Sequence, residues 1–259
     1  MRHMDDIILQ HMRSIRRGIA LCWLGNLSWL LSSQNRLIAF DLDLHLDCRI
    51  RTSPIPAEAI APMLEVVFIT HEHEDHFNST TSGILANKSD CLFVVPANCE
   101  QKALEIGITE KRIHIARPGE AFDLPGIHVE PQRAIHGDKL FTVYRHANLK
   151  DCGYVFKFGG KTFLQPGDTV LLEEHLELTH VDVLFVSPTV HNTYIDRSTI
   201  LINAIEPDYI FPQHFGTYIQ NEENLFWTKG YPDELKAKLS RSMQAHYHKL
   251  NPGEVFVIE

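Results

Sequence analysis

The most informative stretch of this chain is Thr70-His71-Glu72-His73-Glu74-Asp75-His76, which follows the apolar run 64–69 (Leu-Glu-Val-Val-Phe-Ile). The run is short and rich in β-branched and aromatic residues, so it predicts a buried strand. One of Asn78, Ser79 and Thr80 then caps a helix. The pattern therefore predicts a strand, a polar loop and a helix, in that order.

The polar loop contains three imidazoles and a carboxylate, a donor set suited to zinc, manganese or iron. His71 and His73 stand two residues apart in an extended loop, so their side chains point the same way and suit one ion. Asp75 and His76 turn toward the helix start, where they suit a neighbouring ion. The alternative is a solvated, histidine-rich loop, and the two intervening glutamates fit that description.

The spacing His-Glu-His-Glu-Asp-His at 71–76 resembles the His-x-His-x-Asp-His signature of the metallo-β-lactamase superfamily. The resemblance implies three later ligands at strand ends: a histidine, an aspartate and a histidine. His136 closes the segment that begins at Glu130, Asp168 lies in a Gly-Asp-Thr motif after a strand, and His214 ends the strand that begins at Tyr209. A histidine after a strand is more often structural when it stands alone, so the prediction depends on the order of all four motifs.

The resemblance implies an α/β fold, an αββα four-layer sandwich of two mixed β-sheets flanked by helices, in a single domain over residues 1–259. It also implies two divalent metal ions, zinc or manganese with iron as a further candidate. His71, His73 and His136 would bind the first ion, Asp75, His76 and His214 the second, and Asp168 would bridge them. Asp75 and Asp168 are the catalytic candidates.

The flanking sequence indicates a branch of the superfamily. Residues 21–25, the strand that ends at Asp41, residues 210–217 and residues 251–254 resemble the L-ascorbate-6-phosphate lactonase branch. Oxygen-reducing diiron members carry a glutamate at position 73, where this chain has a histidine, so a hydrolase is favoured. The expected reaction is attack of a metal-activated hydroxide on a lactone, such as that of a sugar acid or its phosphate. The alternatives are a phosphodiesterase with the same dinuclear site and a non-catalytic metal-binding protein.

Further residues are candidates for supporting roles. Asp41 or Asp43 would lie behind the metal ligands, as in the superfamily, although the polar face of an ordinary strand explains them equally well. His191 is an extra histidine near the later motifs. Aromatic candidates for a substrate pocket are Tyr194, Tyr218 and Trp227, and cationic candidates for an anionic substrate are Arg51, Lys139, Arg145 and Lys229.

The composition of the chain limits which binding partners and which cellular compartment are expected. The net charge of −9 disfavours nucleic acid, so a small-molecule substrate is expected. The cysteines are odd in number and form no Cys-x-x-Cys pair, which indicates reduced thiols in a cytoplasm. Residues 16–25 superficially resemble a signal peptide, but the continuing strand-like runs favour a β meander, and no membrane span is expected. A homo-oligomer is compatible with the sequence.

The remaining pattern predicts alternating strands and helices. The expected helices are 4–15, 98–106, 173–179, 196–205 with Asp196 as its cap, and 232–241. The expected strands are 19–24, 27–32, 36–41, 91–95, 110–116, 121–130, 153–158, 161–164, 181–186, 209–211 and 254–258. Residues 50–61, with their prolines, predict an irregular loop, and a second strand-rich half is expected from about Phe141.

Overall fold

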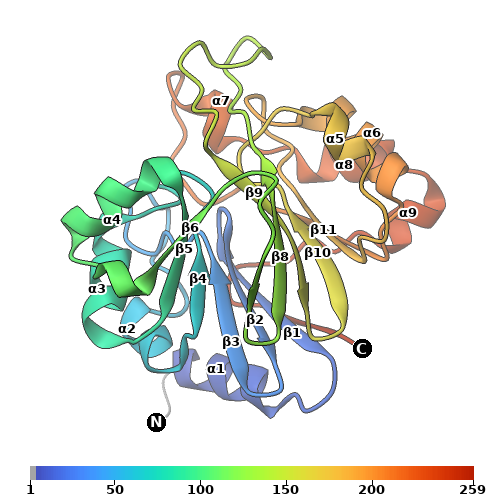
Figure 1. Cartoon of the computed structure of the whole chain (residues 1–259). Coiled ribbons are helices and arrows are strands. Elements are labelled where there is room, and N and C mark those ends of the chain that lie inside the picture. Colours follow the sequence, from blue (N-terminus) through green and yellow to red (C-terminus); the bar gives the residue numbers. More distant parts are fainter. Residues whose placement is uncertain (1–3) are drawn as a thin grey trace. The chain divides into compact units, whose positions relative to one another are not determined.

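The structure is a computed structural model that describes residues 4–259. The chain forms two compact units. The first unit extends to Ala116 and includes Leu250–Glu259, and the second unit is Arg117–Lys249. Each unit contains one mixed β-sheet with helices (Figure 1). The expected α/β fold with two mixed sheets flanked by helices is confirmed.

The first unit has a sheet in the order β13-β1-β2-β3-β4-β5-β6 within the described residues. Its strands are β1 (Ile19–Gly25), β2 (Ser28–Ser33), β3 (Arg36–Phe40), β4 (Val66–Phe68), β5 (Leu92–Pro96), β6 (Ile113–Ala116) and β13 (Val255–Ile258). Its helices are α1 (Met4–Ser14), α2 (Ala57–Ile60), α3 (Ser79–Lys88) and α4 (Glu100–Ile106), with short 3-10 turns at Ala61–Met63, Ala97–Cys99 and Glu110–Arg112. Pairing is antiparallel from β13 to β3 and parallel from β3 to β6.

The apolar pattern of the sequence explains this unit. β1 and β2 are buried along their whole length, and Ile8, Leu9 and Met12 on one face of α1 join their core. On the other helices, Leu85 of α3 and Ala103 of α4 pack in the same cluster, and Figure 1 shows both helices beside β5 and β6. The expected N-terminal helix and β meander are confirmed.

The second unit has a sheet in the order β12-β11-β10-β9-β8-β7. Its strands are β7 (Phe122–Leu124), β8 (Ile127–Arg133), β9 (Cys152–Phe158), β10 (Lys161–Gln165), β11 (Val183–Val186) and β12 (Tyr209–Pro212). Its helices are α5 (Glu173–Leu176), α6 (Tyr194–Ile205), α7 (Leu225–Thr228), α8 (Pro232–Lys238) and α9 (Arg241–Ala245). β10, β11 and β12 are parallel, whereas β7, β8, β9 and β10 pair antiparallel. Leu201 of α6 and Leu235 of α8 pack with Leu184 of β11 in the core.

Several expectations for individual elements are wrong. The strand expected at 110–116 begins only at Ile113, because Glu110–Arg112 form a 3-10 turn. The segment 121–130 is a hairpin of β7 and β8, because Gly126 adopts a left-handed turn conformation. The helix expected at 196–205 begins at Tyr194, so Asp196 lies in its first turn and does not cap it. The helix expected at 232–241 is divided, because Ser240 caps α9 through a bond from Met243 N–H to its hydroxyl. The loop expected at 50–61 contains α2.

Within residues 4–259, no helix is both long and apolar enough to cross a membrane.

Candidate metal centre

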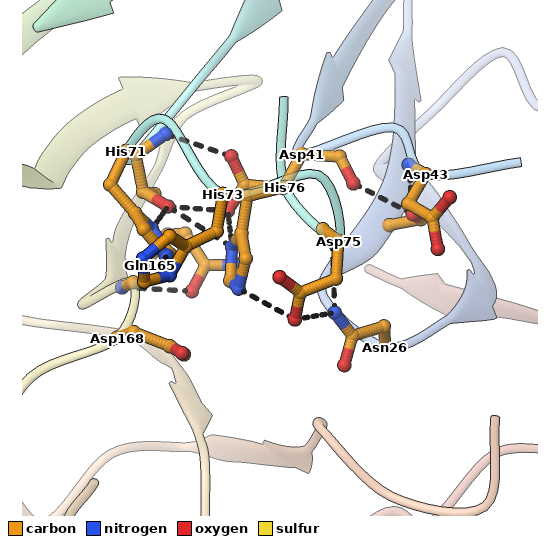
Figure 2. Close-up of polar contacts among 12 residues, drawn as sticks. Asn26, Asp41, Asp43, His71, His73, Asp75, His76, Gln165 and Asp168 are labelled. Carbon is orange, nitrogen blue, oxygen red and sulfur yellow. Dashed lines mark hydrogen bonds and ion pairs between the residues drawn. The ribbon is translucent and has the colours of Figure 1, made fainter. Parts of the chain in front are cut away.

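The first unit gathers polar side chains where two parallel strands end. β3 and β4 are neighbours in the sheet; Asp41 directly follows β3, and Thr70 and His71 follow β4. Carboxyl ends of adjacent parallel strands are the usual place for a binding site in α/β proteins. We call His71, His73, Asp75 and His76 the first half-site (Figure 2).

Asp41 and Thr70 determine which ring nitrogens the first half-site presents. Asp41 is fully buried and accepts bonds from Thr70 N–H (2.8 Å), the Thr70 hydroxyl (2.6 Å) and His76 Nδ1 (2.9 Å). The single Thr70 hydroxyl hydrogen is used by Asp41, so its oxygen accepts from His71 Nδ1 at 3.1 Å. Both imidazoles therefore carry the proton on Nδ1, which makes Nε2 the electron-pair donor of each ring. Burial raises the pKa of the Asp41 carboxyl, and His76 and Thr70 act in the opposite direction.

The geometry of His71 and His73 fits a shared metal ion. His71 Nε2 lies 3.0 Å from His73 Nδ1. Two nitrogen ligands at about 2.0–2.1 Å from one ion stand roughly 3 Å apart, so both atoms suit the same ion.

Asp75 and His76 form a second pair of donors. Asp75 Oδ2 lies 3.4 Å from His76 Nε2. Asn26, in the turn between β1 and β2, donates from Nδ2 to the Asp75 carbonyl (2.9 Å) and to Oδ2 (3.3 Å), as Figure 2 shows. The sequence alone does not indicate Asn26 as a site residue, because it lies 49 residues from its partner. The one available signal was its place in a Gly25-Asn26 turn, where Asn26 has a φ of 48°.

Two other acidic residues near the first half-site have structural contacts. Asp43 is buried, accepts from Leu46 N–H and forms an ion pair with Arg49, so it holds the loop after β3. Glu74 accepts from the Ser79 N–H and hydroxyl at the start of α3, and pairs with Lys102 at 2.9 Å. Of the two aspartates that are candidates for a place behind the ligands, Asp41 contacts the ligand histidine His76.

The second unit gathers its own polar cluster at strand ends. Asp168, His191 and His214 follow the parallel strands β10, β11 and β12, and His136 follows β8. Donor atoms of His136, Asp168 and His191 all lie within 4.8 Å of one another, a grouping that suits a metal ion. We call His136, Asp168, His191 and His214 the second half-site.

Asp168 is the centre of the second half-site. Its Oδ2 lies 2.8 Å from His191 Nε2 and 3.6 Å from His136 Nε2. Its Oδ1 accepts from Asn192 Nδ2 at 2.8 Å and lies 3.2 Å from His214 Nδ1. His136 donates from Nδ1 to the Gly137 carbonyl at 2.7 Å, so its Nε2 is the electron-pair donor.

His191 lies between two oxygen acceptors. Its Nε2 faces Asp168 and its Nδ1 lies 3.2 Å from the Phe226 carbonyl. Burial lowers the pKa of His191 to about 4, despite the Asp168 carboxylate, so the ring is neutral and has one N–H for two oxygens. The imidazoles and the Asp168 carboxylate of this half-site are donors of the kinds that bind divalent cations.

Residues that the sequence analysis did not single out position the second half-site. Gln165 and Gln213 exchange amide hydrogen bonds of 3.0 and 2.7 Å beneath the ends of β10 and β12. Gly137 packs so tightly that a Cβ there would lie 2.1 Å from the His191 carbonyl oxygen, and one on Gly230 would lie 2.6 Å from the His214 carbonyl oxygen. No local sequence pattern distinguishes these glutamines or glycines from others in the chain.

The remaining candidates have varied environments. The Tyr194 ring lies 5.2 Å from the Phe141 ring, whereas Tyr218 is buried against Trp227. Lys229 lies 5.0 Å from the Tyr231 ring. Exposed cationic candidates are Arg51, Lys139 and Arg145.

Comparison with known proteins identifies the family. The sequence model of a β-lactamase superfamily domain matches residues 20–214, which is most of the chain. The chain belongs to the metallo-β-lactamase superfamily.

Relatives and solved structures agree with this membership. A UPF0173 metal-dependent hydrolase of Carboxydothermus hydrogenoformans is 24% identical over 247 residues, with 92% of this chain and 99% of that protein covered. The structure of Igni18, a metallo hydrolase of Ignicoccus hospitalis, has a TM-score of 0.69 and 19% identity, and covers 93% of this chain and 98% of its own. The structure of a possible metal-dependent hydrolase of Veillonella parvula has a TM-score of 0.72 and 14% identity, and the match covers 93% of this chain and 100% of that one. These structures share the superfamily fold with this chain.

Proposed function

We propose that this protein is a metal-dependent hydrolase in which the two half-sites together bind two divalent cations. The assignment of ligands follows the superfamily pattern: His71, His73 and His136 for one ion, Asp75, His76 and His214 for the other, and Asp168 between them. Membership in the superfamily and relatives named metal-dependent hydrolases support it. Zinc, manganese and iron all suit this donor set.

One observation carries the proposal. The buried Asp41 and Thr70 together hold the protons of His71 and His76 on Nδ1, so that both rings present Nε2 as electron-pair donors. Hydrogen bonding of the distal ring nitrogen is the usual way in which proteins orient metal-binding histidines. A solvated loop would not need a buried carboxylate behind it, because burial of a charge is unfavourable without compensation.

The residues of the half-sites have separate roles in the proposed reaction. Two divalent cations, when bound, lower the pKa of a water molecule and stabilise negative charge on the substrate oxygen. Asp75, held by Asn26 and 3.4 Å from His76, orients the attacking water and transfers its proton to the leaving oxygen. Asp168 keeps a fixed orientation because His191 and Asn192 each hold one of its oxygens.

A lactone is the proposed substrate. The flanks of the motifs resemble the lactonase branch of the superfamily, and His73 stands where oxygen-reducing members carry glutamate. Hydrolysis adds water across the ring ester bond, so the leaving alkoxide takes the proton from Asp75 and remains part of the hydroxy-acid product.

The test combines metal analysis with a substrate screen. Protein purified without added metal is expected to retain two equivalents and to hydrolyse simple lactones faster than bis-p-nitrophenyl phosphate. Faster cleavage of the phosphodiester would favour a phosphodiesterase, and bound metal without turnover of either compound would favour a metal-binding protein.

A variant tests the role of Asp168. Asp168→Ala is expected to lower turnover by more than about 100-fold, beyond the 10–100-fold typical of residues behind the ligands. Glu72→Gln, at an exposed position in the ligand loop 71–76, is the control, and its turnover should be unchanged. Turnover close to wild type in Asp168→Ala, with two metals still bound, would contradict the assignment.

A further inference from the structure

The segment between β8 and β9 exposes an unusual amount of apolar surface. Of the twelve large hydrophobic side chains exposed in the described chain, five lie on this one loop. Leu140 is 69% exposed and Leu149 is 73% exposed, and the other three are Phe141, Val143 and Tyr144. Figure 1 shows this loop projecting beyond the ends of β8 and β9. Contiguous exposed apolar side chains commonly mark a binding surface.

This apolar loop (residues 137–149) is attached directly to the second half-site. Tyr144 N–H donates to the His136 carbonyl at 2.8 Å, and the two rings lie 6.1 Å apart. Gly137 and Val143 form a β-bridge. Inside the loop, the Asp138 carboxylate accepts from the N–H groups of Leu140 and Thr142. The loop is therefore an ordered structure with its base at a candidate metal ligand.

An aromatic contact joins the apolar loop to the segment that follows His191. The Phe141 ring lies 5.2 Å from Tyr194, and Tyr194 lies 5.2 Å from Tyr231. Tyr194 stands three residues after His191, which contacts Asp168. Phe141 and Tyr194 have φ angles of 62° and 47°, which are uncommon for bulky residues and concentrate at ligand-binding sites.

The charge of the apolar loop differs from that of the whole protein. The chain has a net charge of −9, yet Lys139 and Arg145 are exposed on this loop. Its one acidic side chain, Asp138, is engaged by backbone N–H groups. The loop thus combines exposed apolar groups with cations, which suits a ligand that carries both an alkyl or aryl group and a negative charge.

We infer that the apolar loop is the substrate-recognition surface of the second half-site, and that it selects a lactone with an alkyl or aryl substituent, whose hydroxy-acid product is anionic and amphipathic. The inference deepens the proposed function. It rests on that function for the chemical class of the substrate, a lactone. A sugar-acid lactone, with hydroxyl groups around its ring, would leave the exposed Leu140 and Leu149 side chains in contact with water.

Binding of product-like carboxylates tests the inference without catalysis. Octanoate and gluconate carry the same charge, and only octanoate has an apolar chain. Calorimetry on the full metal-loaded chain is expected to give a dissociation constant for octanoate at least about tenfold lower than for gluconate, because each buried methylene contributes several-fold in affinity.

Variants locate the binding surface. Leu140→Ser/Leu149→Ser changes two side chains that are mostly exposed, so folding should be unaffected. This double variant is expected to weaken octanoate binding about five- to tenfold and to leave gluconate binding unchanged. Ile200→Ser, on α6 at 51% exposure, is the matched control and should bind octanoate as the wild type does.

Several results would overturn the inference. One is equal affinity of the wild type for octanoate and gluconate. Another is a double variant that binds octanoate as tightly as the wild type does. A dimer in light scattering that the double variant dissociates, with octanoate affinity unchanged, would assign the loop to an interface between copies. If the wild type bound phosphatidylcholine vesicles and the double variant did not, again with octanoate affinity unchanged, the loop would be assigned to binding a lipid surface.

Kinetics separate this inference from the proposed function. The double variant should raise KM for γ-decanolactone without changing kcat, and should leave both constants for γ-butyrolactone as in the wild type. Loop-dependent octanoate binding without hydrolysis of any lactone would refute the proposed function and retain the binding surface. Lactone hydrolysis without a preference for the longer chain would refute the inference and retain the function.

Discussion

Asn26 holds Asp75 from a position far away in the sequence, and this contact yields a prediction for a single residue. Its amide donates to the carbonyl and to the carboxylate of Asp75. Asn26→Gly removes the amide but retains the left-handed backbone, because glycine adopts positive φ freely. We expect kcat on the best lactone substrate to fall about 10–100-fold, as for other residues that orient a ligand.

The control for this prediction is Asn35→Gly. Asn35 also has a positive φ, of 66°, but is exposed in the turn between β2 and β3. Its activity should match the wild type. Equal activity of Asn26→Gly and Asn35→Gly would show that the contact with Asp75 has no role in catalysis.

Single residues divide into those that the sequence could indicate and those that it could not. The spacing of His71 to His76 is local, and His136, Asp168 and His214 each follow a strand, so pattern and resemblance suffice to nominate them. Asn192 and the Gln165–Gln213 pair contact partners at least 22 residues away, on other strands or loops. Such contacts depend on strand order, which no local pattern contains.

Among the elements, the loop after β8 packs closely against the loop after β11. This packing predicts how a methyl group added at Gly137 changes stability and metal binding. A Cβ on Gly137 would lie 2.1 Å from the His191 carbonyl oxygen, far inside a normal contact. Gly137→Ala must therefore move one loop, which separates His136 from Asp168. We expect destabilisation of about 1–3 kcal/mol in chemical denaturation, together with weaker metal binding.

Gly83→Ala is the matched control for that change. Gly83 lies inside α3, and a Cβ there would have an ordinary contact of 3.9 Å with Ile106. Alanine should raise the free energy of unfolding by about 0.5–1 kcal/mol, because glycine loses more backbone entropy in a helix. Gly137→Ala as stable as the wild type would contradict the packing.

His175 on α5 predicts a pH dependence of stability. The ring is buried, and its Nδ1 accepts from Leu172 N–H. Burial lowers the pKa of His175, although Glu174 acts in the opposite direction. Below the unfolded-state pKa of about 6.5, the unfolded chain binds a proton that the folded chain binds less well, so stability falls as the pH decreases.

Replacing the imidazole tests this linkage. His175→Asn retains an acceptor but does not titrate, so its unfolding free energy should fall less between pH 7 and pH 5 than that of the wild type. The difference is bounded by about 1.4 kcal/mol per pH unit for one proton. Parallel pH profiles of the two proteins in urea denaturation would show that His175 titrates equally in both states.

Elements were predictable where one apolar period ran without interruption. α1, the three strands β1 to β3 and the helix at Glu100–Ile106, which ends at Gly107 in the left-handed conformation, all follow such periods. The misplaced boundaries lie where turns or caps interrupt the pattern, as at Gly126 and Ser240. Glycine and serine also occur at many other positions in the chain, so the sequence alone does not say which of them ends a strand or begins a helix.

At the scale of the whole molecule, the fold class could be predicted because the order of motifs matches a known superfamily, and the family match agrees. The substrate could not, because one superfamily fold supports many reactions and specificity lies in loops. The loop between β8 and β9 was expected to begin a strand-rich half, and its exposed apolar side chains are visible only once β8 and β9 are placed.

The proposed function requires that the two half-sites bind one pair of metal ions together. Anomalous scattering from crystals of the metal-loaded protein measures this directly. If the proposed function holds, two metal peaks lie about 3.5–4 Å apart. Their ligands then include His71, His73 and Asp75 from the first unit and His136, Asp168 and His214 from the second. Peaks bound by residues of one unit alone, or half-sites that bind metal far apart, would contradict it.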